Sequence, residues 1–108
     1  MAYKTLSAEQ LKEIINRIIN IAKPERIIMF GSAARDEMSA YSDVDLLVIK
    51  DGKYDQNKIT RDIYINMIGI EQAVDVILAT PEQVEKYKDI NYLIIAPALK
   101  EGKEIYHA

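Results

Sequence analysis

Two aspartates two residues apart introduce an apolar segment near the middle of the chain. Asp43 and Asp45 come just before the run from Leu46 to Ile49. In a strand, residues two apart point to the same face, so both carboxylates would project together from one end. Like charges this close repel each other, and a hard cation with oxygen ligands relieves the repulsion. The spacing therefore predicts a Mg²⁺ site, because Mg²⁺ keeps coordination positions for substrate phosphates.

A glycine and a serine follow an earlier apolar run. Gly31 and Ser32 come directly after the segment 27–30, and Ala33, Ala34 and Arg35 continue the chain. This pattern predicts a tight turn into a helix N-terminus, where free backbone N–H groups and the helix dipole favour phosphate. Together with the two aspartates, it predicts a nucleoside triphosphate held across the gap between two adjacent strands.

A third acid lies in a later apolar segment. Within 73–79, the apolar residues Val74, Val76 and Leu78 alternate with Asp75 and Ile77, which predicts a strand fit for burial. A lone acid there is costly unless it is paired or bound to metal. If this strand lies beside the segment 43–49, Asp75 completes a cluster of three carboxylates. Such a cluster could hold two metal ions for an in-line displacement at phosphorus.

Each of these signals has an ordinary structural explanation when it is taken alone. Gly-Ser after a strand is commonly a simple turn, and Asp-x-Asp can cap a strand or hold a structural ion. Arg35 suits a phosphate or partner contact and equally a surface position. Ser42 can simply cap the loop before Asp43. The combination is more specific, because each part places a costly group where a phosphate and a metal would justify it.

The stretch 31–48 resembles the signature of the minimal nucleotidyltransferases of the DNA polymerase beta superfamily. That signature is a Gly-Ser, followed after a short connection by Asp-x-Asp, with a third Asp on a later strand. The matching residues are Gly31, Ser32, Arg35, Ser42, Asp43, Asp45, Leu46 and Val48, with Asp75 as the third acid. The family often has Gly after the Arg, where this chain has Asp36; the difference concerns the conformation of the connecting loop.

The resemblance implies a function and a partner. It implies that Asp43, Asp45 and Asp75 are catalytic and bind two Mg²⁺ ions, and that Gly31, Ser32, Arg35 and Ser42 bind ATP. It further implies a toxin–antitoxin system, in which this protein is the antitoxin and transfers AMP to a tyrosine of a HEPN-domain ribonuclease toxin. Two alternatives stay open: transfer to a small molecule such as an aminoglycoside, and a non-catalytic antitoxin that acts by occlusion. A homo-oligomer or a hetero-oligomer is compatible with each of these three functions.

Composition restricts the remaining classes of function. A chain of 108 residues is expected to form one domain, 1–108, with little room for a separate substrate domain. It has no cysteine, and its one histidine, His107, is next to the C-terminus, which disfavours a zinc enzyme or a Ser-His catalyst. The formal charge of -3 argues against direct nucleic-acid binding. No segment resembles a signal peptide or a membrane span, so we expect a cytoplasmic protein.

The elements expected around these residues make an α/β fold, a small mixed sheet flanked by helices, similar to the nucleotidyltransferase fold of polymerase beta. Helices are expected from a Ser7–Gln10 capping box to before Pro24, over 33–38, from Ile59 through Met67 to about Ile70, and from Thr80 to about Lys88. Strands are expected at 26–30, 43–49 and 73–79, with a short edge strand at 103–106. Pro97 divides 92–99 into two short helices or one kinked helix that ends at Gly102.

Overall fold

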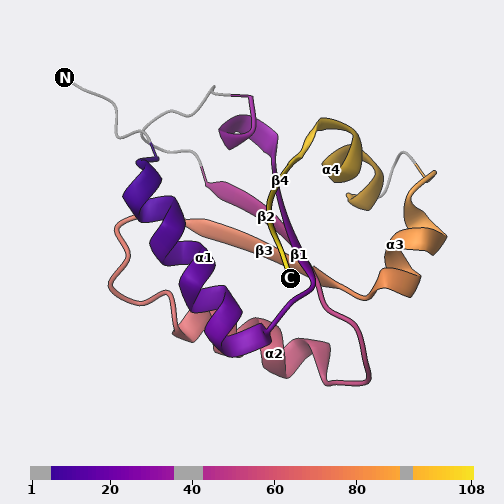
Figure 1. Ribbon diagram of the computed structural model, residues 1–108, viewed down its shortest axis with the longest axis horizontal. Helices are drawn as coiled ribbons and strands as arrows, with labels where there is room; N and C mark the ends of the chain where they lie inside the picture. The colour runs from indigo at the N-terminus through magenta and orange to yellow at the C-terminus, as the bar shows by residue number, and fades with distance from the viewer. Residues whose placement is uncertain (1–5, 36–42, 91–93) are drawn as a thin grey trace.

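The computed structural model describes residues 6–35, 43–90 and 94–108, which form a four-stranded mixed sheet with helices on both faces (Figure 1). The strands are β1 (Arg26–Phe30), β2 (Val44–Ile49), β3 (Val74–Ala79) and β4 (Lys103–His107), in the spatial order β3-β2-β1-β4. Strand β1 is antiparallel to β2 and β4, whereas β2 and β3 are parallel. The predicted α/β class with a small mixed sheet is confirmed.

The first two helices begin at side-chain caps. Helix α1 (Ala8–Ala22) starts at the expected capping box, in which Ser7 and Gln10 each bond to the other's backbone N–H. Helix α2 (Gln56–Ile65) starts at Asp55, whose carboxylate accepts from the Lys58 N–H. This helix ends earlier than predicted, and Met67 packs into the core from the turn that follows. Apolar spacing alone therefore overestimated its length.

Two short helices follow β3. Helix α3 (Pro81–Tyr87) starts at Thr80 as predicted, with the Thr80 side chain as its cap and Pro81 as its first residue. Helix α4 (Ile95–Glu101) is a single helix that contains Pro97 as its third residue. The first turn of a helix leaves its N–H groups without intrahelical partners, so a proline there removes no hydrogen bond. The alternative of two short helices is wrong for the described part, 94–101.

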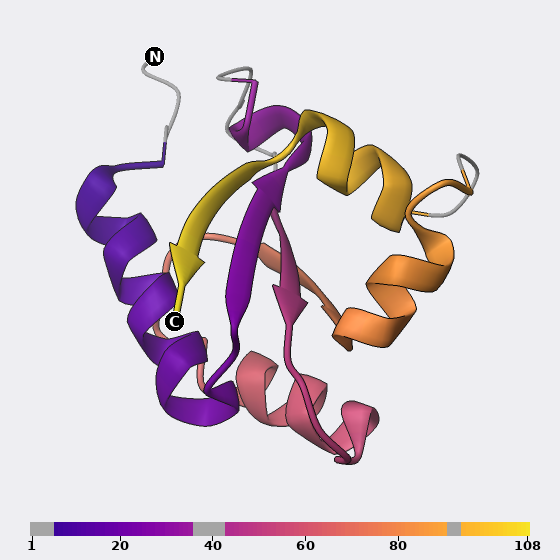
Figure 2. The same cartoon turned by 45° about the vertical axis from the view of Figure 1, so that its right-hand side comes forward.

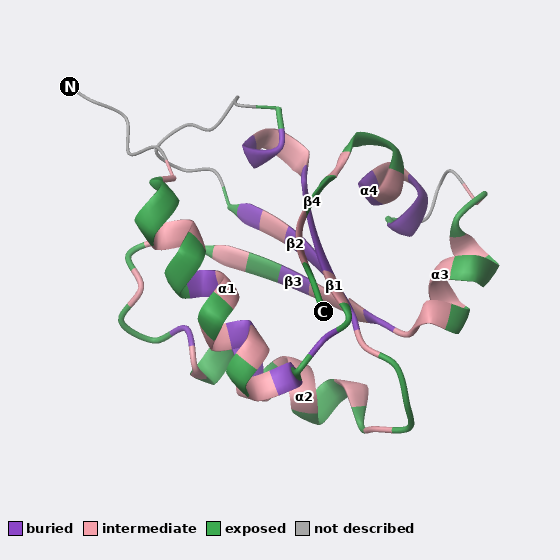
Figure 3. Ribbon diagram, in the orientation of Figure 1, coloured by how far each residue is buried: buried purple, intermediate pink, exposed green. Residues whose placement is uncertain are grey.

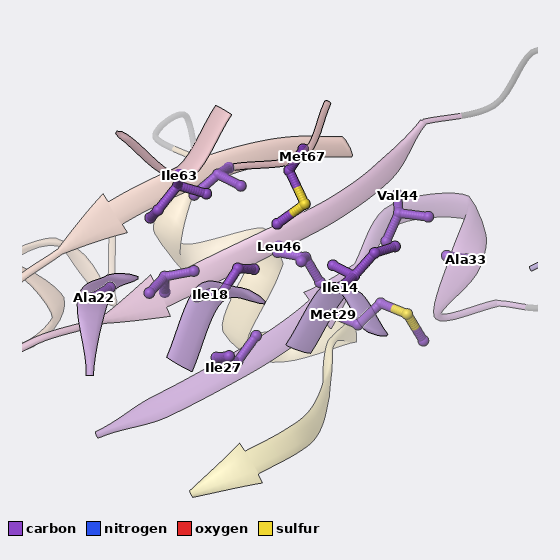
Figure 4. Close-up of a cluster of buried hydrophobic side chains, with 12 residues drawn as sticks. Ile14, Ile18, Ala22, Ile27, Met29, Ala33, Val44, Leu46, Ile63 and Met67 are labelled. Carbon is purple, nitrogen blue, oxygen red and sulfur yellow. The ribbon is translucent and has the colours of Figure 1, made fainter. Parts of the chain in front are cut away.

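The sheet separates two layers of apolar packing. Helices α1 and α2 cover one face of the sheet (Figure 2). On this face Ile14, Ile18 and Ile63 pack on alternate residues of β1, β2 and β3 (Figure 4). Helices α3 and α4 cover the other face, where Ile95 and Ala98 join a second cluster. Burial follows the same division, with the centre of the sheet most enclosed (Figure 3). No helix in the described ranges is long and apolar enough to cross a membrane.

The connection after β1 differs from its prediction. A 3-10 helix, η1 (Gly31–Ala33), begins at the glycine itself, and its turn is closed by bonds from the Ala34 and Arg35 N–H groups to the Gly31 and Ser32 carbonyls. The expected α-helix from Ala33 is therefore wrong at its start, because these bonds span three residues instead of four. The rest of that expected helix, 36–38, lies outside the described residues.

Candidate active site

Gly31 lies where β1 ends, against the carboxylate of Asp45. Its φ of +71° is in the left-handed region, which glycine adopts without the penalty of a side chain. A Cβ at this position would collide with Asp45 Oδ2, a contact too close for any other residue. Both the left-handed backbone and the space taken by Asp45 therefore require glycine at this position. The glycine brings the start of η1 directly beside the Asp45 carboxylate. The sequence predicted the turn but not this contact.

Asp45 and Asp75 are direct neighbours on the two parallel strands. They are register partners in the β2–β3 ladder, and Phe30 opposes Asp45 on the other side. Residues at the same register position point to the same face of a sheet. Val44, Leu46 and Val76 belong to the cluster under α1 and α2, so the two aspartates face the layer of α3 and α4. The two strands are adjacent, which was the condition for placing Asp75 beside Asp45.

Asp43 completes the local concentration of negative charge. It comes directly before β2 and is exposed, whereas Asp45 is half-buried. Burial raises the pKa of Asp45, and the charges of Asp75 and then Asp43 raise it further. The charges of Asp75 and Asp43 therefore disfavour the ionised form of Asp45, which is a condition that a bound cation relieves.

Asp75 is exposed, which corrects the expectation that it lies in a buried setting. The reason is the strand order: β3 is at the edge of the sheet. Helices α3 and α4 also pack over later positions of the strands, on Leu47, Ile49 and Ala79. The argument from the cost of burial does not apply to this acid. Its accessibility suits a group that must be reached by a second substrate.

Tyr64 contacts Asp75 and was missed by the analysis of the sequence. Its hydroxyl donates to Asp75 Oδ1 at 3.0 Å and accepts from the Val76 N–H at 2.8 Å. Burial raises the pKa of Tyr64, the hydrogen bond with the Val76 backbone lowers it, and the hydrogen bond and charge of Asp75 raise it, so the net pKa is raised. The local sequence gives little signal for this contact, which joins the last turn of α2 to the strand that follows.

The remaining predicted residues have different positions. Ser32 lies in η1 and is half-buried, beside Gly31. Arg35 is exposed and donates to Glu101 Oε2 at 3.1 Å, an ion pair that links the end of η1 to the end of α4. Ser42 and Asp36 lie outside the described residues. A phosphate or partner contact of Arg35 stays a prediction.

The three aspartates offer the carboxylate oxygens that Mg²⁺ prefers, but they do not form a complete metal site by themselves. Within the described ranges, no group of three or more His, Cys, Asp or Glu side chains is arranged to hold a metal ion by itself. Mg²⁺ is usually held by one or two carboxylates, with waters and substrate phosphates supplying the other ligands. The Asp45–Asp75 pair, with Asp43 nearby and Gly31 leaving room against Asp45, is suited to that arrangement.

Comparison with known proteins identifies the family. A family model described as a nucleotidyltransferase domain matches residues 9–100, a range that contains every candidate site residue. The chain belongs to the nucleotidyltransferase domain family. This confirms the family that the sequence resembles. Gly31, Asp45 and Asp75 therefore lie together in a domain of the nucleotidyltransferase family.

Individual nucleotidyltransferase relatives agree with the family and the fold. A candidate protein adenylyltransferase of Methanocaldococcus jannaschii is 43% identical over 75 residues, covering 63% of this chain and 49% of that protein. The chain thus matches about half the length of this relative. A toxin–antitoxin structure with AMP-PNP superposes with a TM-score of 0.67 at 16% identity, covering 90% of this chain and 73% of the other.

A further solved structure shares the fold. A complex of a tri-AMPylated Shewanella oneidensis HEPN toxin with its MNT antitoxin matches with a TM-score of 0.51 at 18% identity, covering 92% of this chain and 73% of the other. At these identities the comparison establishes a shared fold. The α/β nucleotidyltransferase fold expected from the sequence is confirmed.

Proposed function

We propose that this nucleotidyltransferase domain transfers AMP from ATP to a tyrosine hydroxyl of a partner HEPN ribonuclease toxin and acts as its antitoxin. The observation that carries the proposal is the register pairing of Asp45 with Asp75 directly beside Gly31. Relatives support the choice of donor and acceptor, since one is a candidate protein adenylyltransferase and another was solved in complex with a tri-AMPylated HEPN toxin.

Two groups of residues bind different parts of the ATP triphosphate and its metal ions. Gly31 and Ser32 bind the leaving β- and γ-phosphates through backbone N–H groups and the serine hydroxyl. Asp43, Asp45 and Asp75 would hold two Mg²⁺ ions. When bound, Mg²⁺ neutralises triphosphate charge and makes the α-phosphorus easier to attack. The domain therefore contributes mainly positioning and electrostatic stabilisation.

Asp75 accepts the proton of the acceptor hydroxyl in this proposal. The tyrosine oxygen attacks the α-phosphorus, the bond to the β-phosphate oxygen breaks, and pyrophosphate leaves. Exposure of Asp75 at the edge of the sheet favours a protein acceptor, because a partner that brings its own binding surface can reach this carboxylate. Arg35 and Ser42 are assigned to nucleotide binding by the resemblance alone.

Intact mass of the co-expressed partner tests the proposal. With the wild-type chain, the toxin should gain one or more AMP units and lose ribonuclease activity. Asp45→Asn should abolish the gain, and the exposed Asp51→Asn should leave it unchanged. Neutralisation of the toxin by Asp45→Asn without any mass gain would instead select occlusion. Transfer from α-labelled ATP to an aminoglycoside and never to the partner would select the small-molecule reaction.

A further inference from the structure

The open edge of β3 is covered by a tyrosine from the opposite layer. Carbonyls of Ala73 and Ala79 accept from the N–H groups of Val44 and Lys50 on the β2 side. Backbone groups alternate in direction along a strand, so those of Val76 point away from β2. The Tyr64 hydroxyl accepts the Val76 N–H there. Tyr64 thus reaches from α2, past the edge of the sheet, to the face that carries Asp75.

The single proton of the Tyr64 hydroxyl is directed to Asp75. A phenol has one donor, and its nearby acceptors are Asp75 Oδ1 at 3.0 Å and the Val76 carbonyl at 3.5 Å. A bond to an ionised carboxylate is shorter and roughly twice as strong as one to a neutral acceptor. The N–H of Val76 fixes the other side of the same oxygen. The hydroxyl is therefore held in a defined orientation that restrains one oxygen of Asp75.

We propose that Tyr64 is a positioning residue for Asp75: it anchors Oδ1 and leaves Oδ2 for the metal and the acceptor hydroxyl. An exposed carboxylate on an edge strand would otherwise sample several rotamers. Hydrogen-bonding partners of metal-binding carboxylates typically change metal affinity or activity 10–100-fold when removed. This role rests on the proposed function, because it assumes that Asp75 binds the cation.

A purely structural role for Tyr64 is the competing explanation. The same hydroxyl joins α2 to β3, so Tyr64→Phe should also cost some stability. Tyr54 offers a matched control: it is half-buried, and its hydroxyl donates to the Lys50 carbonyl at 2.7 Å instead of to an aspartate. Tyr54→Phe removes a comparable hydrogen bond without removing any contact of Asp43, Asp45 or Asp75. The two variants separate loss of stability from loss of metal affinity.

Calorimetric titration of Mg²⁺ into protein with excess AMP-PNP tests the role. Tyr64→Phe should weaken Mg²⁺ affinity at least tenfold, whereas Tyr54→Phe should stay within about twofold of wild type. In an Asp75→Asn background, adding Tyr64→Phe should cause no further loss, because the tyrosine acts through that carboxylate. Wild-type affinity in Tyr64→Phe, equal losses in both tyrosine variants, or additive losses in the double variant would overturn the role.

A measurement on the wild-type protein does not depend on how the variants fold. With ring-labelled tyrosine, the NMR signal of Tyr64 should shift when Mg²⁺ is added with AMP-PNP, and that of Tyr54 should not. An unmoved Tyr64 signal in protein that takes up Mg²⁺ and AMP-PNP overturns the role of Tyr64 alone. A wild-type chain with no Mg²⁺-dependent uptake of AMP-PNP overturns both that role and the proposed function.

Discussion

Gly31 is constrained by its own backbone and by the carboxylate beside it, and these two constraints can be separated. Gly31→Ala introduces a Cβ at a φ of +71° and into contact with Asp45 Oδ2. Gly52→Ala is the matched control, because Gly52 has a φ of +99° but nothing within 4 Å of the added Cβ. The left-handed backbone should cost each variant about 1–2 kcal/mol.

The collision should destabilise Gly31→Ala by about a further 1–3 kcal/mol, because crowding beside a half-buried group forces its neighbours to move. Chemical denaturation of both variants measures the difference in unfolding free energy. Gly31→Ala should also weaken nucleotide binding, because Asp45 must shift. Equal destabilisation of the two variants would contradict the close contact between Gly31 and Asp45.

Asp45 should reduce the stability of the metal-free protein at neutral pH. Its pKa is raised in the folded state by burial and by the charges of Asp75 and Asp43. The free energy of unfolding is therefore lower when Asp45 is ionised than when it is protonated. Asp45→Asn should therefore raise the unfolding free energy in EDTA by roughly 0.5 kcal/mol, a small value because the group stays partly solvated.

The gain from Asp45→Asn should depend on pH with a defined sign. Above the folded-state pKa of Asp45, the variant should show its full gain in unfolding free energy. The gain should shrink as pH falls through that pKa, and it should vanish below the unfolded-state pKa, where wild-type Asp45 is protonated in both states. Denaturation at several pH values in EDTA measures it. A gain that grows as pH falls would contradict the assigned direction of the shift.

Helix α1 is joined to the end of α2 through one arginine. Arg17 donates to the carbonyls of Asn66 and Ile68 at 2.9 and 3.0 Å, and the Asn66 amide donates back to the Arg17 carbonyl at 3.3 Å. The contact fixes the turn that follows α2 and therefore the helix that carries Tyr64.

Replacing Arg17 should destabilise the packing of α1 on the turn after α2. Arg17→Ala leaves two carbonyls without a charged donor, and hydrogen bonds to charged groups contribute about 1.5–3 kcal/mol each, so we expect a net loss of about 2 kcal/mol. Lys12→Ala on the exposed face of the same helix should change stability by less than about 0.5 kcal/mol. Thermal unfolding compares them, and similar effects of the two changes would contradict the role of Arg17.

Local signals in the sequence predicted elements better than contacts between elements. The capping box at Ser7, the helix start at Thr80 and the strand 26–30 depend on neighbouring residues, and all three predictions agree with the structure. The exposure of Asp75 depends on strand order, and the Tyr64–Asp75 bond depends on how α2 lies over the sheet. Neither can be read from spacing along the chain. The Asp45–Asp75 pairing was predicted only on the condition that the two strands are adjacent.

At the scale of the whole molecule, α1 and α2 cover one face of the sheet and α3 and α4 the other, whereas Asp43 and Asp75 stay exposed. A ligand that binds these aspartates only in the folded state must stabilise the entire domain, because a domain of this size usually unfolds as one unit. The carboxylates repel one another without a cation. Mg²⁺ and nucleotide should therefore increase stability together, and more than either does alone.

Thermal unfolding with Mg²⁺ and AMP-PNP measures this coupling. At a ligand concentration about 100 times its dissociation constant, the gain should be about 2.7 kcal/mol. For a domain of this size, that gain corresponds to a rise in Tm on the order of ten degrees. EDTA should remove most of the rise, and Asp45→Asn should prevent it even though this variant starts from a more stable metal-free state. A rise of equal size in EDTA would show that the nucleotide binds without the carboxylates, which would contradict the assignment of Asp45 and Asp75 as the metal-dependent half of the site.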